Sequence, residues 1–395
     1  MIEAVHERGY PQTLVAHVIA LAGVSRRAFY EQFANKEACF LATYDIVVAR
    51  ARKVALDAWT RERGWDNRLR GSLKALLSDI ADHPNGPHLV LVDSLGIGPR
   101  AGERLRLAAS SFERVLAMAF QVDPRGEELS ALNVKAIVAG IRHITFMRMY
   151  QHREKELYSL ADEILDWIES YRSPATERLN VSDVTRLGDA RPRVAAFLSG
   201  EDSRSRVLNA LVHLTLDERY SELSDSQIAR FANLSDDAFH ELFADKEACF
   251  LAVLDEFVAE AIQAVKGVIE HASSWPEAVH LAVRELVAFF ASHEALSRLA
   301  FIEIFDVGPG MIDRMMRPAE DFMKQLDGPG PEARRGPLVA REAITGAIWG
   351  IVSAYAFQDR VKQLPYLADQ LTFIVLAPYL EPDAAIEVIE SARGR

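Results

Sequence analysis

The sequence predicts an all-α protein made of two copies of one helical module. Apolar residues recur three and four positions apart along most of the chain, for example at Leu73, Leu76, Leu77 and Ile80, and this is the period of an amphipathic helix. The sequence lacks the runs of alternating β-branched and polar residues that indicate half-buried strands. In addition, a segment near the N-terminus recurs 210 residues later.

The internal repeat extends over most of the chain. Over residues 25–51, 17 of 27 positions are identical to those 210 residues further on, and the same offset pairs Trp65 with Trp275. After a length change of three residues, the match resumes with Gln151 and Gln358. A period this long indicates two joined domains rather than a solenoid of short repeats.

Breaks in the helical pattern divide each repeat into a head and a larger body. Glycine, proline and scattered charges, which interrupt helices, gather between residues 173 and 202, and this segment is predicted to be a linker. The predicted boundaries are a first head at 1–48, a first regulatory body at 49–172, the linker at 173–202, a second head at 203–258, a second regulatory body at 259–381 and a C-terminal tail at 382–395.

Composition excludes several classes of protein. Hydrophobic residues make up 49% of the chain and charged residues 26%, which suits a packed core rather than disorder. The two cysteines, Cys39 and Cys249, are too few for a disulfide framework, and we expect both to be small buried hydrophobic side chains. The first residues lack the apolar core of a signal peptide, and the longest uncharged stretch, 343–358, is too short to span a bilayer comfortably. The sequence therefore predicts a cytoplasmic protein without a membrane segment.

The charge of the chain is unevenly distributed. The formal net charge is −12, which opposes DNA binding because phosphates are neutralised by Lys and Arg. However, residues 1–50 carry five basic and five acidic side chains, whereas residues 211–260 carry three basic and twelve acidic ones. Most of the acidity therefore lies in the second head.

The first head carries the pattern of a helix-turn-helix. A short helix is predicted from about Leu14 to Ala22, followed by a turn at Gly23 and a second helix that opens at Ser25. Thr13 and Ser25 are suitable N-caps for the two helices, and glycine supplies the positive φ of a tight turn. Such a motif places the N-terminal residues of its second helix in the major groove of DNA.

The second helix of this motif has an apolar side and a polar side. Phe29 and Phe33, four residues apart, are predicted to face inward. The residues left to meet a DNA groove are Arg26, Arg27, Tyr30 and Gln32. Asn35 can cap the next helix, whose first amides, together with Lys36, can meet a phosphate.

These residues resemble the N-terminal domain of TetR/AcrR-type transcriptional regulators. The matching positions are Gly9-Tyr10, Thr13, Ala22-Gly23-Val24-Ser25, Phe29-Tyr30, Phe33 and Lys36-Glu37-Ala38. The end of the second repeat is similar to the closing helices of the same family, so the resemblance covers nearly the whole chain, twice. It implies, for each repeat, a three-helix DNA-binding head followed by a helical domain that binds a small ligand and dimerises through its last two helices.

The resemblance also assigns positions that contact DNA. These positions are Thr13, Ser25, Arg26, Arg27, Tyr30, Gln32 and Lys36. The family usually has Gly-Thr where this chain has Arg27-Ala28, so the base preference of the family does not carry over.

The second head keeps the scaffold of the first but loses its DNA contacts. Phe239 and Phe243 preserve the apolar pair, and Asn233, a residue type that tolerates positive φ, replaces Gly23. The contact positions are occupied by Asp236, Asp237, His240 and Leu242. Two carboxylates at the tip of the helix would face phosphates of the same sign, so we expect a degenerate head that does not dock on DNA.

Aromatic and methionine residues of the two bodies allow two interpretations. Core packing accounts for each of them singly. Alternatively, some of them line a ligand cavity between these helices, which the family resemblance implies and which such adaptable apolar walls suit. The candidates are Phe112, Phe146, Tyr150, Met315, Phe322, Trp349 and Tyr355. His143 is a further candidate for a ligand contact, although a lone histidine is more often a satisfied core residue.

The sequence predicts a transcriptional regulator without enzymatic activity, cofactor or metal. It contains no phosphate-binding loop, dinucleotide motif or zinc-ligand spacing. We expect a repressor that binds a double-stranded DNA operator through the first head and is released by a small apolar or amphipathic effector. Its modules are expected to form a pseudo-dimer within one chain, with or without a further homodimer of chains. The alternative is a ligand-binding or protein-interaction module that has lost DNA binding and contacts a basic partner.

Overall fold

The computed structural model describes residues 1–95, 97–126, 129–172, 179, 200–307, 314, 317–318, 321 and 339–393. All regular structure within these residues is helical, so the predicted all-α class is confirmed for this part of the chain. No helix in the same part is long and apolar enough to cross a membrane. The linker predicted at 173–202 lies outside the described residues, apart from residues 179 and 200–202.

The chain divides into two compact units. Unit 1 consists of Met1–Pro174 and Pro337–Ala347, and unit 2 consists of Ala175–Gly336 and Ile348–Arg395. Helix α17 (Ala340–Ala356) therefore contributes its first half to unit 1 and the remainder to unit 2.

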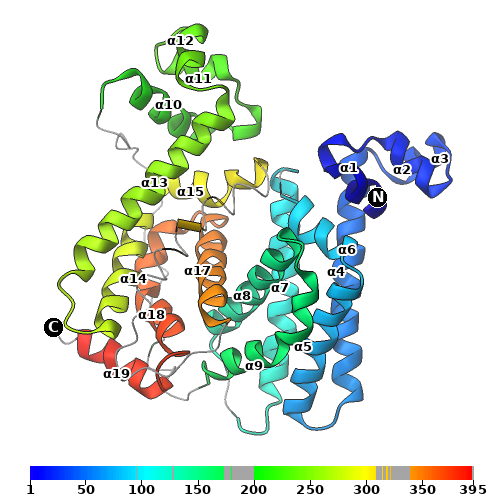
Figure 1. Ribbon diagram of the computed structural model, residues 1–395, viewed down its shortest axis with the longest axis vertical. Coiled ribbons are helices and arrows are strands. Elements are labelled where there is room, and N and C mark those ends of the chain that lie inside the picture. The colour runs from blue at the N-terminus through cyan, green and yellow to red at the C-terminus, as the bar shows by residue number, and fades with distance from the viewer. Residues whose placement is uncertain are drawn as a thin grey trace. The chain divides into compact units, whose positions relative to one another are not determined.

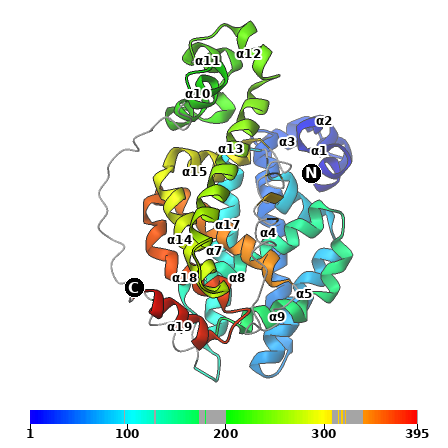
Figure 2. The same ribbon diagram turned by 60° about the vertical axis from the view of Figure 1, so that its left-hand side comes forward.

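Unit 1 begins with three short helices, which we call the first head, and continues into longer helices, which form its body (Figure 1). Its elements are α1 (Ile2–Gln12), α2 (Val15–Ala22), α3 (Arg26–Gln32), α4 (Lys36–Arg61), α5 (Trp65–Asp82), α6 (Asn85–His88), the π-helical turn η1 (Leu89–Asp93), α7 (Pro99–Gln121), α8 (Ala131–Tyr150), the 3-10 segment η2 (Glu154–Ser159) and α9 (Ala161–Glu169). Helix α4 extends from the head into the body, where it packs along α5 (Figures 1 and 2).

The body of unit 1 is stabilised by an apolar stripe on α5. Leu69, Leu73, Leu77 and Ile80 recur at three- and four-residue spacing, and each is at most 8% exposed. Helix α5 packs against α4, η2 and α9. Because burying one such side chain contributes about 1.5–3 kcal/mol, the stripe holds α5 firmly in the bundle.

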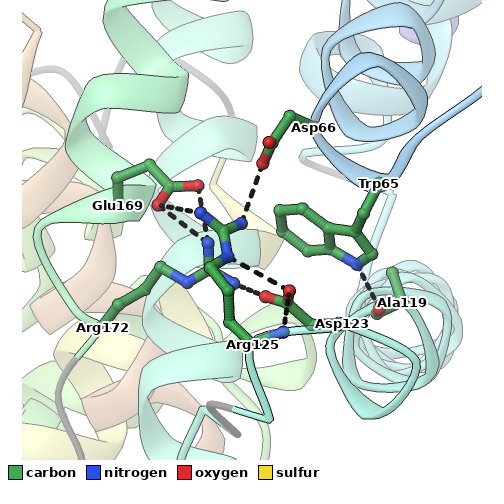
Figure 3. A network of polar contacts seen from close by, with 7 residues as sticks. All are labelled: Trp65, Asp66, Ala119, Asp123, Arg125, Glu169 and Arg172. Carbon is green, nitrogen blue, oxygen red and sulfur yellow. Dashed lines mark hydrogen bonds and ion pairs between the residues drawn. The ribbon is translucent and has the colours of Figure 1, made fainter.

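A polar network ties the end of α9 to the ends of α5 and α7 (Figure 3). Arg172 forms a buried ion pair with Asp123. Asp123 Oδ1 also accepts from Arg125 Nε at 3.2 Å, and Arg125 Nη2 reaches Asp66 Oδ1 at 2.8 Å. Both guanidinium groups lie over the ring of Trp65, at 4.9 Å for Arg125 and 4.6 Å for Arg172. Burial lowers the pKa of Arg172, because a charged guanidinium is less stable away from water. The ion pair with the Asp123 carboxylate offsets this cost of desolvation.

Unit 2 has its own group of short helices at the start of a long one, and we call this group the second head. Its elements are α10 (Ser203–Asp217), the 3-10 segment η4 (Tyr220–Glu222), α11 (Asp225–Phe231), α12 (Asp236–Leu242), α13 (Lys246–Ile269), α14 (Trp275–Ser292), α15 (Glu294–Phe301), the 3-10 segments η5 (Glu303–Asp306) and η6 (Val361–Leu367), α18 (Ala368–Leu376) and α19 (Pro382–Arg393). Helix α14 packs against α13 on one side and against η6 and α18 on others.

An aromatic cluster occupies the body of unit 2. It comprises Phe257 on α13, Phe290 on α14, Phe301 on α15 and Trp349 on α17, and all four side chains are at most 7% exposed. The ring centroids of Phe257 and Phe290 are 5.9 Å apart, those of Phe290 and Phe301 5.2 Å, and those of Phe301 and Trp349 4.8 Å. Aromatic pairs at these separations stabilise a core beyond the area that they bury.

The two repeats begin helices and turns at equivalent residues. Helices α3 and α12 start at Arg26 and Asp236, which are 210 residues apart. His152 and Asp359, the first residues with left-handed backbone after α8 and α17, have φ values of 54° and 53°. The similarity of sequence is therefore accompanied by a similarity of local backbone geometry.

Candidate DNA-binding head and ligand cavity

Helices α2 and α3 form a helix-turn-helix whose turn, and whose caps at Ser25 and Asn35, match the sequence prediction. Gly23 has φ 64°, so the predicted left-handed turn is confirmed. The Ser25 hydroxyl accepts from the N–H of Ala28 at 3.1 Å, and Asn35 Oδ1 accepts from the N–H of Ala38 at 2.8 Å. These two N-caps satisfy amides that the first turns of α3 and α4 leave without helical partners.

Thr13 lies inside the head, and the prediction that it caps α2 is wrong. Its side chain is 0% exposed, and its hydroxyl lies 3.0 Å from the carbonyl oxygen of Ala4 and 2.7 Å from that of Gly9. The N-cap of α2 is Leu14, whose N–H donates to His17 Nδ1 at 3.2 Å. Helix α1 breaks at Gly9, where φ is 72°, and the Thr13 hydroxyl is used for contacts with carbonyl oxygens of α1 instead of a cap on α2.

A small apolar cluster fixes the orientation of α3. The cluster consists of Ala4, Val18, Phe29 and Cys39, with Phe33 packed against it. The rings of Phe29 and Phe33 have centroids 5.5 Å apart. The inward orientation that the sequence predicted for these two phenylalanines is confirmed, and Cys39 is buried as expected.

The opposite side of α3 presents a basic and aromatic surface. Arg26, Arg27, Tyr30 and Gln32 are all exposed. The Arg26 guanidinium lies 5.8 Å from the centroid of the Tyr30 ring, and Arg27 Nε lies 2.9 Å from Glu31 Oε1. An exposed helical ion pair of this type contributes only about 0.3–0.5 kcal/mol, so Arg27 can exchange Glu31 for a partner on DNA at little cost.

Lys36 is engaged by the head itself. Its Nζ donates to the carbonyl oxygen of Tyr10 at 2.9 Å and lies 4.1 Å from the centroid of the Tyr10 ring. Partial burial lowers the pKa of Lys36 and raises that of Tyr10 to about 12. The sequence placed Lys36 against a phosphate, whereas in the structure its ammonium connects α4 to α1.

The second head reproduces the scaffold of the first. Asn233 has φ 57° in the turn, which confirms its predicted role. The Ser235 hydroxyl accepts from the N–H of Ala238 at 3.2 Å, and Phe239 is 0% exposed. Lys246 Nζ donates to the carbonyl oxygen of Tyr220 at 3.0 Å, as Lys36 does to Tyr10.

The surface of α12 is acidic where that of α3 is basic. Asp236 and Asp237 are exposed in its first turn, and Asp236 Oδ2 accepts from Ser226 Oγ at 2.7 Å. His240 and Leu242 are exposed in the places of Tyr30 and Gln32. A carboxylate at a helix N-terminus is stabilised by the helix dipole. The two aspartates are therefore compatible with a stable α12, although their negative charge would repel DNA phosphates.

A cavity of about 800 Å³ lies in the body of unit 1, lined by residues of α4, α5, α7 and α8. Its wall is mainly apolar and includes Val47, Ile80, Leu91 and Phe112. Such a volume falls within the range of about 300–1,000 Å³ that is typical of small-molecule sites.

The residues predicted for a ligand pocket are distributed differently. Phe112 lines the cavity. Phe146 is buried outside it, with its ring stacked 5.7 Å from that of Tyr150. Trp349 belongs to the aromatic cluster of unit 2, and Tyr355 lies under the Arg360 guanidinium at 5.1 Å. Met315 and Phe322 lie outside the described residues.

The histidine considered for ligand contact also lies away from the cavity. His143 is 6% exposed on α8 and packs against Gly346, where a Cβ would come within 2.2 Å of the His143 Cβ. The burial of His143 agrees with the favoured interpretation of a core histidine. Its neighbour in the sequence, Arg142, lines the cavity together with Val138, Ile141 and Thr145 of α8. Sequence reasoning did not consider Arg142, and the signal for it is a lone basic residue among the uncharged positions of this helix face.

Comparison with known proteins bears mainly on the first head. Residues 2–43 match the family model described as bacterial regulatory proteins, tetR family. A curated relative, the HTH-type transcriptional regulator EthR of Mycolicibacterium smegmatis (strain ATCC 700084 / mc(2)155), is 27% identical over 109 residues, which are 27% of this chain and 50% of that protein. The chain thus spans about half the length of this relative.

Two solved structures are similar to parts of the chain. The fatty acid degradation regulator FadR from Bacillus halodurans matches with a TM-score of 0.38 and 16% identity, over 44% of this chain and 94% of that one. A TetR family transcription regulator from Marinobacter aquaeolei VT8 matches with a TM-score of 0.34 and 19% identity, over 42% of this chain and 93% of that one.

The segment matched by the family model contains the turn at Gly23, the caps at Ser25 and Asn35 and the Phe29 anchor. It comprises α1, α2, α3 and the first turns of α4. Residues 2–43 therefore form a helix-turn-helix domain that matches the model of the tetR family.

Proposed function

We propose that this chain is a transcriptional regulator that binds double-stranded DNA through the first head only. The observation that carries the proposal is the contrast between α3, which exposes Arg26 and Arg27 at its start, and α12, which exposes Asp236 and Asp237. Arginine at the tip of such a helix can bind guanine edges or phosphates, whereas the aspartates oppose the backbone charge of DNA.

The repeat suggests how the two modules are used. Helix-turn-helix dimers bind two half-sites whose centres are about 34–36 Å apart. In the proposed arrangement the two modules of one chain form a pseudo-dimer, and this pair occupies one half-site only. Two chains are then needed to cover a complete two-fold operator.

Regulation is proposed to act through the cavity of unit 1. A small apolar or amphipathic ligand in the cavity would contact α4 and could shift it. This helix both lines the cavity and extends into the first head. We propose that ligand binding weakens DNA binding and so relieves repression. Because coupling between two sites is reciprocal, DNA would weaken ligand binding by the same factor.

The decisive experiment is a mobility-shift titration of the full chain with the DNA upstream of its own gene. We expect the wild type to bind and the double variant Arg26→Asp, Arg27→Asp not to bind, with unchanged helical content by circular dichroism. The matched control is Asp236→Ala, Asp237→Ala in the second head, which should still bind. Failure of the wild type to bind any upstream DNA at low salt would overturn the proposal and favour a module whose acidic head contacts a basic partner.

A further inference from the structure

The cavity of unit 1 contains a positive charge without a counter-ion. Arg142 lines it from α8, and among the described residues no carboxylate forms an ion pair or hydrogen bond with this side chain. The side chain is partly accessible although protein surrounds it, which is the combination expected of a group that faces an internal cavity. An arginine remains protonated under all ordinary conditions, so the cavity is cationic at this point.

The nearest titratable neighbour does not compensate the charge. Tyr44 also lines the cavity and is 1% exposed, and burial raises its pKa, so that the phenol stays neutral. Burial likewise lowers the pKa of Arg142, which expresses the cost of keeping a guanidinium away from water. A buried charge is tolerated when it is paired and hydrogen-bonded, and here the protein itself supplies no partner within the described residues.

The remaining charged residues of the wall are also basic. Arg52 and Lys53 lie at the exposed rim on α4, and none of the described aspartates and glutamates lines the cavity. Lys53 is paired with Asp57 at 2.6 Å, whereas Arg52 has no ion pair within the described part of the chain. The electrostatic field in and around the cavity therefore favours anions.

The second repeat provides an internal comparison, because aromatic or apolar residues stand at positions equivalent to cavity residues and to both arginines. By the repeat offsets, the cavity residues Val47, Ile80, Leu91 and Arg142 correspond to Phe257, Phe290, Phe301 and Trp349. These four are the aromatic cluster of unit 2, whose rings pack on one another at 4.8–5.9 Å. Arg52 corresponds to Ile262. The repeat that fills the equivalent positions with aromatic rings has also replaced both unpaired arginines with apolar residues.

We propose that the cavity of the first repeat binds an amphipathic organic anion, with a carboxylate paired to Arg142 and an apolar body against Val47, Ile80 and Leu91. A guanidinium presents parallel N–H groups that match a carboxylate in a bidentate pair. This inference rests on the proposed role of the cavity as the effector site and specifies the chemical class of the effector.

The test compares three probes with the same ten-carbon chain: decanoate, decanol and decylamine, each below the concentration at which it forms micelles. Binding to the full chain is measured by calorimetry and by the shift in unfolding temperature. We expect decanoate to bind at least about tenfold more tightly than decanol, a difference of about 1.4 kcal/mol, and decylamine to bind more weakly than either.

Two variants assign the preference to the site. Arg142→Met keeps the stem of the side chain, and we expect it to bind decanol and decanoate equally. Leu91→Phe, which copies Phe301, should lose both probes. Arg52→Met at the exposed rim is the matched variant and should reduce the preference for decanoate far less than Arg142→Met does, because its charge adds to the field without pairing with the carboxylate. Circular dichroism and the unfolding temperature of each variant show that it is folded.

The possible outcomes separate this inference from the proposed function. Equal binding of decanoate and decanol to the wild type, no binding of either, or an unchanged preference in Arg142→Met would overturn the inference while leaving DNA binding through the first head intact. Decanoate binding that depends on Arg142 but never alters DNA affinity would support the inference and contradict the proposed regulation.

Discussion

The ammonium of Lys36 lies 2.9 Å from the carbonyl oxygen of Tyr10 and 4.1 Å from the centroid of its ring. In the second head Lys246 contacts the carbonyl oxygen of Tyr220 at 3.0 Å and its ring at 4.7 Å. The second head has aspartates in place of the arginines at the start of α3 but has kept this lysine. A lysine that is present in both heads, with the same contacts, is better explained by a role in the fold than by the role in DNA binding that we propose for the arginines.

Replacing Lys36 with methionine should therefore destabilise the first head. A charge-assisted hydrogen bond to a carbonyl and a cation–π contact are lost, and we expect the free energy of unfolding to fall by about 1 kcal/mol for this partly exposed group. Chemical denaturation of the full chain measures the change. Lys246→Met is the matched variant and should behave alike. If Lys36→Met instead left stability unchanged and reduced the salt dependence of DNA binding by about one phosphate contact, Lys36 would be a DNA-binding residue, as the sequence suggested.

Replacing Arg27 with alanine should weaken operator binding without affecting the fold. Arg27 has 89% of its side chain exposed, so only the weak pair with Glu31 is lost from the free protein. A bidentate base contact would cost about 1–3 kcal/mol of binding free energy, together with specificity at one position of the operator. Mobility shifts on the native site and on single-base variants provide the measurement. Asp237→Ala, at the equivalent position, should leave affinity unchanged; equal affinities for the wild type and Arg27→Ala would remove Arg27 from the interface.

Local signals in the sequence were sufficient to predict the scaffold of both heads. The positive φ at Gly23 and Asn233 and the caps at Ser25 and Asn35 depend on interactions within four residues, so each can be inferred from a short stretch of sequence. Thr13 could not be inferred in this way. Its hydroxyl contacts the carbonyl oxygens of Ala4 and Gly9 in α1, and the contact with Ala4 depends on how the whole of that irregular helix folds.

The family resemblance implied a cavity, and the sequence left its seven candidate residues open between cavity lining and core packing. Phe112 lines the cavity of unit 1, whereas Phe146 and Trp349 are buried outside it. An aromatic residue on an amphipathic helix can face either a core or a cavity, and its sequence context does not distinguish the two. Arg142 was recognisable in principle as a basic residue in an otherwise apolar helix face. Its lack of a partner depends on which side chains from α4, α5 and α7 surround it, and that is a property of the tertiary structure alone.

Asp123 should be essential for the stability of unit 1. Its side chain is 0% exposed and carries the charge opposite to Arg172 and Arg125 (Figure 3). Removing one partner of a buried ion pair costs about 3–5 kcal/mol because the other charge is left uncompensated, and we expect Asp123→Asn to approach that range in chemical denaturation. The control is Asp66→Asn, where the 73% exposed carboxylate pairs with the same Arg125 and the expected change is below about 1 kcal/mol. If the two variants lowered the free energy of unfolding by the same amount, the buried carboxylate of Asp123 would contribute no more to stability than the exposed one of Asp66.

The charge difference between the two heads leads to a prediction about salt. The logarithm of the binding constant falls with the logarithm of the salt concentration by about 0.9 for each phosphate neutralised. Helix α3 of the first head exposes arginines and the equivalent α12 exposes none, so under the proposed function the slope per chain should reflect the contacts of one head.

Installing arginines in the second head should change that slope. Because Asn233, Ser235 and Phe239 already hold α12 in the same local geometry as α3, the double variant Asp236→Arg, Asp237→Arg should steepen the slope by up to about two contacts and raise affinity for non-specific DNA. The variant Asp236→Asn, Asp237→Asn is the control for charge removal alone and should leave the slope close to that of the wild type. A slope that fell by half in this control would show that the acidic head takes part in DNA binding, and the assignment of DNA binding to the first head alone would then have to be abandoned.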